Sequence, residues 1–114
     1  MDPEDLLRNF YAALNERDLT TLLNLLAPDV EWPDQLEGGT LHGVEEVEEY
    51  WRQQWKLTNT RLELIHVVMD PNGHAVDTVK ETSRERNADI LSETQVRHQW
   101  EFANGLVKRL RILP

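Results

Sequence analysis

The sequence predicts an α+β fold in which helices from the first half of the chain cover one face of an antiparallel sheet formed by the second half. Three observations indicate this class: apolar residues recur at helical spacing up to about residue 55, they alternate with polar residues from about residue 61, and strong turn signals separate the alternating segments. The 114 residues suffice for one core, so we expect a single domain over residues 1–114.

Caps and apolar spacing predict the first two helices. Asp2-Pro3 is typical of a helix start, and apolar residues from Leu6 to Leu14 then form one face. Asp18 is expected to cap a second helix, which carries leucines up to Leu26 and ends at Pro28-Asp29. Both helices therefore offer an apolar face to a sheet.

A short strand, a loop and a third helix are expected next. Residues 30–32 alternate as a strand does, whereas Pro33 to Gly43 is rich in turn-forming residues and predicts a loop. The third helix runs from Val44 to about Trp55, with Glu45 and Glu46 in its first turn, where the helix dipole favours negative charge.

The remaining chain predicts strands that pair in sequence order. The expected strands are Arg61–Met69, about Ala75–Arg86, about Asp89–Phe102 and Leu106–Leu113, with a strong turn signal at residues 70–73.

Register decides which polar groups face the helices. With Asn87-Ala88 as the turn, Asp77 lies opposite His98 and Glu81 opposite Thr94 on a face that is otherwise apolar. Val79 then opposes Val96 and Ala75 opposes Trp100 on this inner face; Thr78 opposes Arg97, Lys80 opposes Gln95 and Thr82 opposes Glu93 on the polar outer face. The two faces differ as a half-buried sheet requires, and Lys80 and Glu93 are placed to attract each other.

The last strand allows two readings. A two-residue turn at Asn104-Gly105 places Arg109 and Arg111 inside, whereas a three-residue loop with a glycine bulge places the apolar residues 106, 110 and 112 inside. We favour the bulged loop, although it also turns Lys108 inward near the rim.

The inner face carries Asp77, Glu81 and His98 among apolar neighbours. A carboxylate beside an imidazole fixes the ring tautomer and raises its basicity, so Asp77 and His98 form a candidate acid–base pair, with Glu81 as a candidate ligand contact. Two alternatives remain open: the pair satisfies itself beneath the helices, or Asp77 lies near the open end and is solvated.

Aromatic residues at inward positions are candidates for the wall of a cavity. Trp32, Trp51 and Trp100 fall on inward positions with Tyr50 close by, and they suit a flat apolar ligand or ordinary core packing. The pocket reading is better for Trp32, beside the predicted loop, than for Trp51 and Trp100.

Composition excludes several classes of function. A formal charge of −9 repels phosphate backbones, so we expect no nucleic acid partner. The absence of cysteine excludes disulfides and thiolate metal sites. We expect no metal or other cofactor, because histidine pairs at metal-ligand spacing and glycine-rich phosphate loops are lacking. With no signal peptide and no membrane-length apolar run, we expect a cytoplasmic protein without membrane contact.

Several motifs in order resemble the SnoaL-like branch of the nuclear transport factor 2 superfamily, over nearly the whole chain. They are residues 9–15 (Asn-Phe-Tyr-Ala-Ala-Leu-Asn) with Asp18, residues 26–32 (Leu-Ala-Pro-Asp-Val-Glu-Trp), residues 41–43 (Leu-His-Gly) and the ending His98-x-Trp100-x-Phe102-x-Asn104-Gly105. The motifs Trp32-Pro33-Asp34 and Tyr50-Trp51-x-x-Gln54-Trp55 resemble bacterial members most.

The resemblance implies a cystatin-like cone: a curved antiparallel sheet wrapped on three N-terminal helices, with a pocket at the wide end. It also implies homodimers through the outer face, here Lys80, Thr82, Gln95, Arg97 and Gln99. Activities in the superfamily range from polyketide cyclases to members that only bind, so the fold leaves the function open. The base and the two oxyanion donors of ketosteroid isomerase match Trp32, Phe10 and His98, so that mechanism is not expected.

The leading hypothesis is a small-molecule pocket protein, with acid–base chemistry of the cyclase or isomerase kind on a small apolar cyclic compound. Here His98 transfers a proton, Asp77 orients it, and Trp32, Tyr50 and Trp51 hold the ligand. The alternatives are a binding protein without catalysis and a dimeric interaction module whose cavity is filled by its own side chains.

Overall fold

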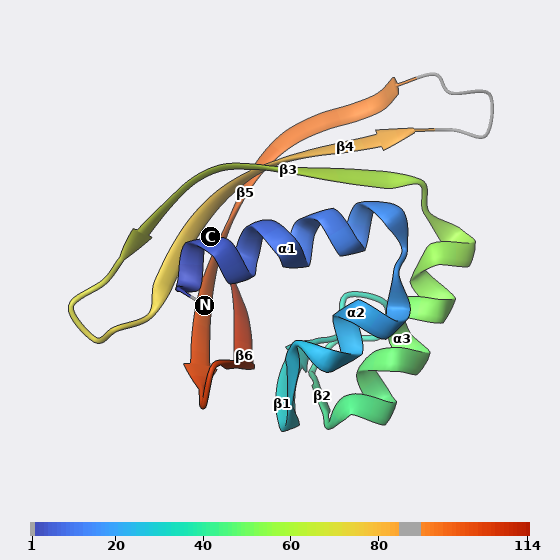
Figure 1. Ribbon diagram of the computed structural model, residues 1–114. Coiled ribbons are helices and arrows are strands. Elements are labelled where there is room, and N and C mark those ends of the chain that lie inside the picture. Colours follow the sequence, from blue (N-terminus) through green and yellow to red (C-terminus); the bar gives the residue numbers. More distant parts are fainter. Residues whose placement is uncertain (1, 85–89) are drawn as a thin grey trace.

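Residues 2–84 and 90–114, which the computed structural model describes, form three helices packed on a curved six-stranded sheet (Figure 1). The helices are α1 (Pro3–Glu16), α2 (Leu19–Asn24) and α3 (Val44–Leu57), and the strands are β1 (Leu26–Pro33), β2 (Thr40–His42), β3 (Thr60–Met69), β4 (Ala75–Arg84), β5 (Ile90–Ala103) and β6 (Leu106–Leu113). Their order in the sheet is β2-β1-β6-β5-β4-β3, which confirms the predicted α+β class.

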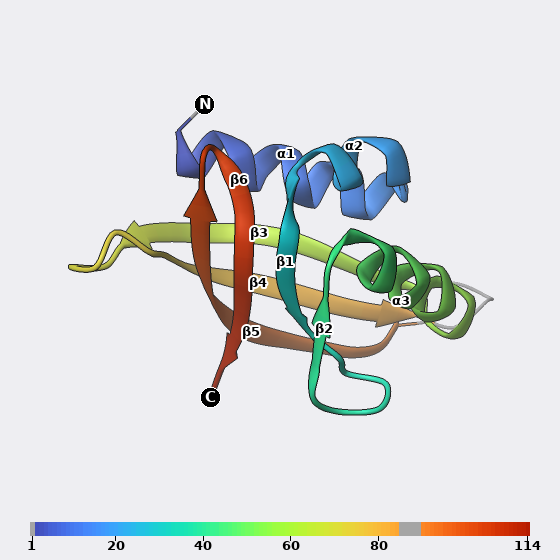
Figure 2. The ribbon, with the colours of Figure 1, turned by 90° about the horizontal axis from the view of Figure 1, so that it is seen from below.

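The predicted caps of the first two helices are confirmed. The Asp2 carboxylate accepts a hydrogen bond from the Asp5 amide at 2.9 Å, and the Asp18 carboxylate accepts one from the Thr21 amide at 3.2 Å. Between the helices, Arg17 takes a left-handed conformation with φ of 56°. This sharp reversal folds α2 back beside α1, as Figure 2 shows from below.

Asn15 fastens the end of α1 to the sheet. Its side chain donates to the Leu62 carbonyl at 2.7 Å and accepts from the Leu62 amide at 2.9 Å. Since β3 is an edge strand, Asn15 satisfies backbone groups there that lack a strand partner. This contact fixes how α1 lies across the inner face.

The second helix is shorter than predicted. It ends at Asn24, and the chain enters β1 at Leu26, which pairs in parallel with Val107 of β6. The sheet is thus mixed, whereas an antiparallel one was expected. Pro28 lies in β1 where the register with β6 is irregular, and a residue without an amide proton is tolerated there.

The predicted loop at residues 33–43 contains a strand. Thr40–His42 pairs antiparallel with β1 as β2. Asp34 holds the turn between them, because its carboxylate accepts hydrogen bonds from the Leu36 and Glu37 amides, both at 3.0 Å. The turn residues were recognised in the sequence, but a three-residue strand gives too short an alternation to identify.

The pairing of β4 with β5 follows the predicted register at every pair that was named. Asp77 opposes His98, Glu81 opposes Thr94 and Ala75 opposes Trp100 on the inner face. The pairs predicted for the outer face are also formed. Lys80 lies 3.2 Å from Glu93, as expected. The predicted turn at Asn87-Ala88 lies outside the described residues.

The turn between β5 and β6 was predicted wrongly. Asn104 and Gly105 form a two-residue turn with φ of 54° and 77°, and Ala103 pairs with Leu106. The bulge lies inside β6 instead. Phe102 of β5 pairs with Val107 and the preceding Glu101 pairs with Arg109, so Lys108 is the residue of β6 without a partner in β5. This bulge buries Val107 and Leu110 and points Lys108 outward to Asp29, so Leu106 and Lys108 are not inside.

An aromatic cluster forms the centre of the core. The Phe10 ring lies 5.1 Å from Trp100 and 5.7 Å from Trp32, and Trp32 lies 5.3 Å from Trp51, measured between ring centroids. Such large rings bury much apolar area, which explains how a chain of modest hydrophobic content folds around a hollow.

Candidate functional site

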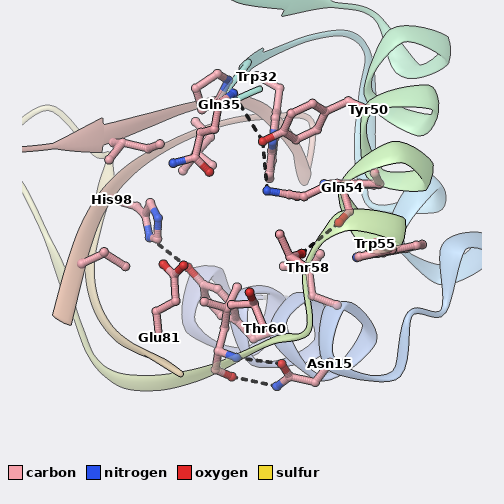
Figure 3. A pocket seen from close by; sticks show the side chains of 18 of the residues that line it. Asn15, Trp32, Gln35, Tyr50, Gln54, Trp55, Thr58, Thr60, Glu81 and His98 are labelled. Atoms are coloured by element: carbon pink, nitrogen blue, oxygen red, sulfur yellow. Dashed lines mark hydrogen bonds between the residues drawn. The ribbon is translucent and has the colours of Figure 1, made fainter. Parts of the chain in front are cut away.

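The described residues leave a cavity of about 160 Å³ between the inner face of the sheet and helices α1 and α3 (Figure 3). Its apolar wall includes Trp32, Trp51, Trp55, Trp100, Leu110 and Ile112, and its polar groups include Tyr11, Gln35, Tyr50, Gln54, Glu81 and His98. Apolar and polar side chains therefore share the cavity wall almost equally, and the apolar rings with converging polar groups suit a small molecule.

Asp77 is fully buried behind the cavity and is held by three neighbours. Its Oδ2 accepts hydrogen bonds from the Tyr11 hydroxyl at 2.5 Å and from the Trp100 indole N–H at 2.8 Å. Its Oδ1 lies 2.9 Å from Nδ1 of His98. A buried carboxylate needs such donors, because burying an unpaired charge is costly. The burial of Asp77 therefore excludes the alternative in which it is solvated near the open end.

His98 connects this buried network to the cavity. Its side chain is 12% exposed and lines the cavity, whereas Asp77 does not. With Nδ1 directed at Asp77, the neutral ring carries its proton on Nδ1 and keeps a lone pair on Nε2. Nε2 makes no hydrogen bond to any residue that the structure describes. The free nitrogen of His98 is thus available to a bound molecule.

Tyr11 completes the network and stays protonated. Burial raises the pKa of its phenol far above the ordinary value, and the negative charge of Asp77 raises it further. The hydroxyl also lies 3.2 Å from Nδ1 of His98. Tyr11 therefore acts as a permanent donor that helps to fix Asp77 and the imidazole.

A second polar group lies on α3. The Tyr50 hydroxyl accepts hydrogen bonds from the Gln54 amide at 3.1 Å and from the Gln35 backbone N–H at 3.4 Å. Burial raises the pKa of Tyr50, although the Gln35 hydrogen bond lowers it in part. This phenol is consequently a neutral group in the cavity wall.

The structure brings the sequence-predicted candidates together. Trp32, Tyr50, Trp51, Glu81, His98 and Trp100 all line the cavity, and Asp77 supports His98 from behind. Trp100 directs its N–H at Asp77, so this donor is not offered to a ligand. What each residue does to a ligand remains a prediction.

Sequence reasoning missed several polar and aromatic residues of the cavity wall: Tyr11, Asn15, Gln35, Gln54, Trp55, Thr58 and Thr60. Helical spacing places Tyr11 and Trp55 on the apolar faces of the first and third helices and says nothing more about them. The signal for Tyr11 was available, because a phenol on a buried helix face needs a hydrogen-bond partner and Asp77 faces the helices. Gln35 and Gln54 carry no such signal, since their positions depend on how the turn and α3 lie over the sheet.

Metal and membrane features are not found in the described part of the chain. No group of three or more histidine or acidic side chains there is arranged to hold a metal ion. None of the described helices is long and apolar enough to cross a bilayer.

Solved structures share this fold across almost the whole chain. A Sinorhizobium meliloti protein, provisionally assigned as a polyketide cyclase, is 22% identical with a TM-score of 0.81, over 96% of this chain and 94% of its own. TerC, co-crystallised with polyporic acid, is 20% identical with a TM-score of 0.81, over 96% and 88%. A Mycobacterium tuberculosis protein in complex with estradiol-17β-hemisuccinate is 14% identical with a TM-score of 0.80, over 96% and 90%.

The SnoaL-like domain family matches residues 7–110, so the chain belongs to this family within the nuclear transport factor 2 superfamily. No functionally curated protein matches the chain. The family and the neighbours establish the fold and leave the reaction to the site itself.

Proposed function

We propose that the cavity binds a small, largely apolar ring compound and that His98 exchanges a proton with it. One observation carries the proposal: Nδ1 of His98 is held by a fully buried carboxylate, while the ring itself lines the cavity. An orienting carboxylate behind an imidazole favours proton acceptance at the free nitrogen and stabilises the imidazolium that forms.

The size of the cavity indicates a single ring. Engineered apolar cavities of about 150 Å³ bind benzene, and the cavity here is of comparable volume at about 160 Å³. The bound molecules of TerC and of the M. tuberculosis protein support small-molecule binding in this fold. The open volume argues against the interaction-module alternative, which requires the core side chains to fill the cavity.

In the proposed mechanism, the neutral imidazole takes a proton from the ligand through Nε2. The imidazolium that forms is stabilised by the hydrogen bond that its Nδ1–H donates to Asp77. Nε2 then returns its proton to another atom of the ligand, and this transfer isomerises the ligand or closes a ring. Tyr11 and Trp100 keep Asp77 in place, so they act as positioning residues. A positioned acid–base group of this kind contributes a factor of about 10²–10⁴.

The test begins with binding of single-ring ketones, lactones and phenols, followed by NMR. We expect saturable shifts of the His98 ring signals, and exchange of ligand C–H protons for deuterium that falls at least about 100-fold in His98→Gln. His42→Gln is the matched control, because His42 does not line this cavity. Binding without exchange would favour the non-catalytic alternative, and no binding by any compound would contradict the proposal.

Asp77→Asn tests the orienting role separately. We expect the neutral His98 ring to lose its preference for the Nδ1–H tautomer, which ¹⁵N shifts report, while the cavity still binds the ring compounds. An unchanged tautomer with lost activity would assign Asp77 a structural role only.

We also propose a homodimer through the outer face of β4 and β5, formed by Lys80, Thr82, Gln95, Arg97 and Gln99, in a cytoplasmic setting. Exposed Val68 adds apolar surface on neighbouring β3. Light scattering at high concentration tests the dimer, and a monomer at all concentrations would refute it.

A further inference from the structure

The charge of the cavity wall has one sign. Among its described lining residues, Glu81 is the one carboxylate, and lysine and arginine are absent. The other titratable side chains of the wall are His98, Tyr11 and Tyr50, and both phenols are held neutral by burial. An anionic ligand therefore meets a negative charge without a fixed positive one, while a cationic ligand meets a counter-ion.

The Glu81 carboxylate is free to take a ligand. The side chain of Glu81 forms no hydrogen bond or ion pair with the residues that the structure describes, although its backbone lies in the ladder of β4 with β3 and β5. Its side chain points into the cavity on the same side as His98, whereas Tyr50 and Gln54 lie across from it (Figure 3). The negative charge of Glu81 also acts on Tyr50 across the cavity. It raises the pKa of the Tyr50 phenol, although burial and the charge of Asp34 raise that pKa more. The Glu81 carboxylate is thus placed to form an ion pair with a positively charged ligand.

The aromatic wall suits the same kind of ligand. Trp32, Trp51, Trp55 and Tyr50 line the cavity, and Trp51 and Trp55 stack with ring planes 11° apart. The faces of such rings attract organic cations as well as flat apolar rings. A carboxylate combined with several aromatic rings is the chemistry that recognises an ammonium group on a small hydrophobic body.

We propose that the ligand is a small ring compound carrying a protonated amine, which pairs with Glu81 while the ring lies against the tryptophans. This inference rests on the proposed function, since it requires a ring in the cavity. It adds the charge of the ligand and assigns Glu81 as the residue that selects it. Neutral ring compounds bind more weakly, and carboxylates bind weakest.

Three probes of nearly equal shape test the proposal: benzylamine, benzyl alcohol and benzoate, each titrated at pH 7 and low salt with tryptophan fluorescence and NMR. In the wild type we expect benzylamine to bind about tenfold tighter than benzyl alcohol, the size of a charged hydrogen bond after its desolvation cost, and benzoate to bind weakest. Glu81→Gln should remove the preference for benzylamine and leave the affinity for benzyl alcohol unchanged.

Glu63→Gln is the matched control. Glu63 lies on neighbouring β3, pairs with Lys80 at 3.3 Å and does not line the cavity. The substitution Glu63→Gln removes the same charge from the protein as Glu81→Gln does, but it leaves the cavity wall unchanged. The preference for benzylamine should therefore survive. Equal binding of benzylamine and benzyl alcohol by the wild type, or a preference that persists in Glu81→Gln, would overturn this inference alone. Binding of none of the three probes would overturn the proposed function as well.

Discussion

Asp77 shows how a single buried side chain organises the site. It collects the Tyr11 hydroxyl, the Trp100 N–H and the His98 ring on two carboxylate oxygens. Because a buried carboxylate that loses a donor retains its desolvation cost, each of these contacts is worth more than a surface hydrogen bond. The network therefore holds the His98 ring in one orientation before any ligand enters.

Tyr11 makes the first prediction at this scale, which concerns alkaline pH. Burial raises the pKa of the folded Tyr11 phenol and Asp77 raises it further, whereas the unfolded phenol ionises at about pH 10. A raised folded pKa means that stability is intact below the unfolded pKa and is lost as pH rises beyond it. Between pH 9 and 11 the melting temperature should fall, and in Tyr11→Phe it should fall less.

The measurement follows phenolate absorbance at 295 nm together with unfolding. The chain has two tyrosines, and neither should ionise near pH 10 while the protein is folded. Tyr11→Phe also loses a hydrogen bond to a charged group, which should cost about 2 kcal/mol at neutral pH. Ionisation of both tyrosines near pH 10 in the folded protein would contradict the buried network.

At the scale of elements, the sequence determines β4 and β5 better than β6. Alternation of Ala75, Asp77 and Val79 with polar residues admits one register, because a slip of one residue buries Arg97. In β6 both Val107 and Leu110 are buried, and a spacing of three breaks the alternation. The break could be placed in the turn or inside the strand, and local sequence does not distinguish these.

A deletion tests this account of β6. The bulge at Lys108 shifts the register by one residue, so removing Lys108 leaves Arg109 opposite Glu101 and Leu110 opposite Trp100 without a bulge. We expect the deletion variant to fold with a modest loss in melting temperature, since it loses only local curvature and the contact with Asp29.

Insertion of one alanine after Lys108 is the matched comparison. If the added residue enters the ladder, it turns Arg109 and Arg111 toward the cavity, and the burial of unpaired charge should abolish cooperative unfolding. Circular dichroism melts of both variants decide the matter. Equal damage by deletion and insertion would show that the bulge itself, rather than the register, is required.

The candidate site contains contacts that the sequence predicts and contacts that it does not. Asp77 and His98 could be paired from sequence because adjacent strands place them opposite each other. Tyr11 and Gln54 lie on helices, and their approach to the sheet depends on helix crossing angles that periodicity leaves open. Local pairing was therefore predictable, whereas the closure of the cavity was not.

At the scale of the whole molecule, the charge of −9 and local hydrogen bonds act on stability in opposite directions as pH falls. Protonation toward the isoelectric point near 4.8 relieves repulsion among carboxylates and should stabilise the fold. Against this, particular carboxylates have lowered pKa values: Asp18 through Thr21, Asp29 through Lys108, Glu31 through Arg109 and Asp70 through the His74 amide.

The sign of the second effect follows from the direction of these pKa shifts. A carboxyl group with a lowered folded pKa contributes stability above its unfolded value of about 4 and loses it as pH falls through the folded value. At low salt the urea midpoint should therefore rise or hold from pH 7 to 5 and then decrease below pH 4. At 0.5 M salt the rise should vanish, because screening removes the long-range repulsion, while the decrease below pH 4 remains since it depends on short contacts. A midpoint that keeps rising down to pH 3 would mean that general repulsion, and not these paired carboxylates, governs the acid stability of the fold.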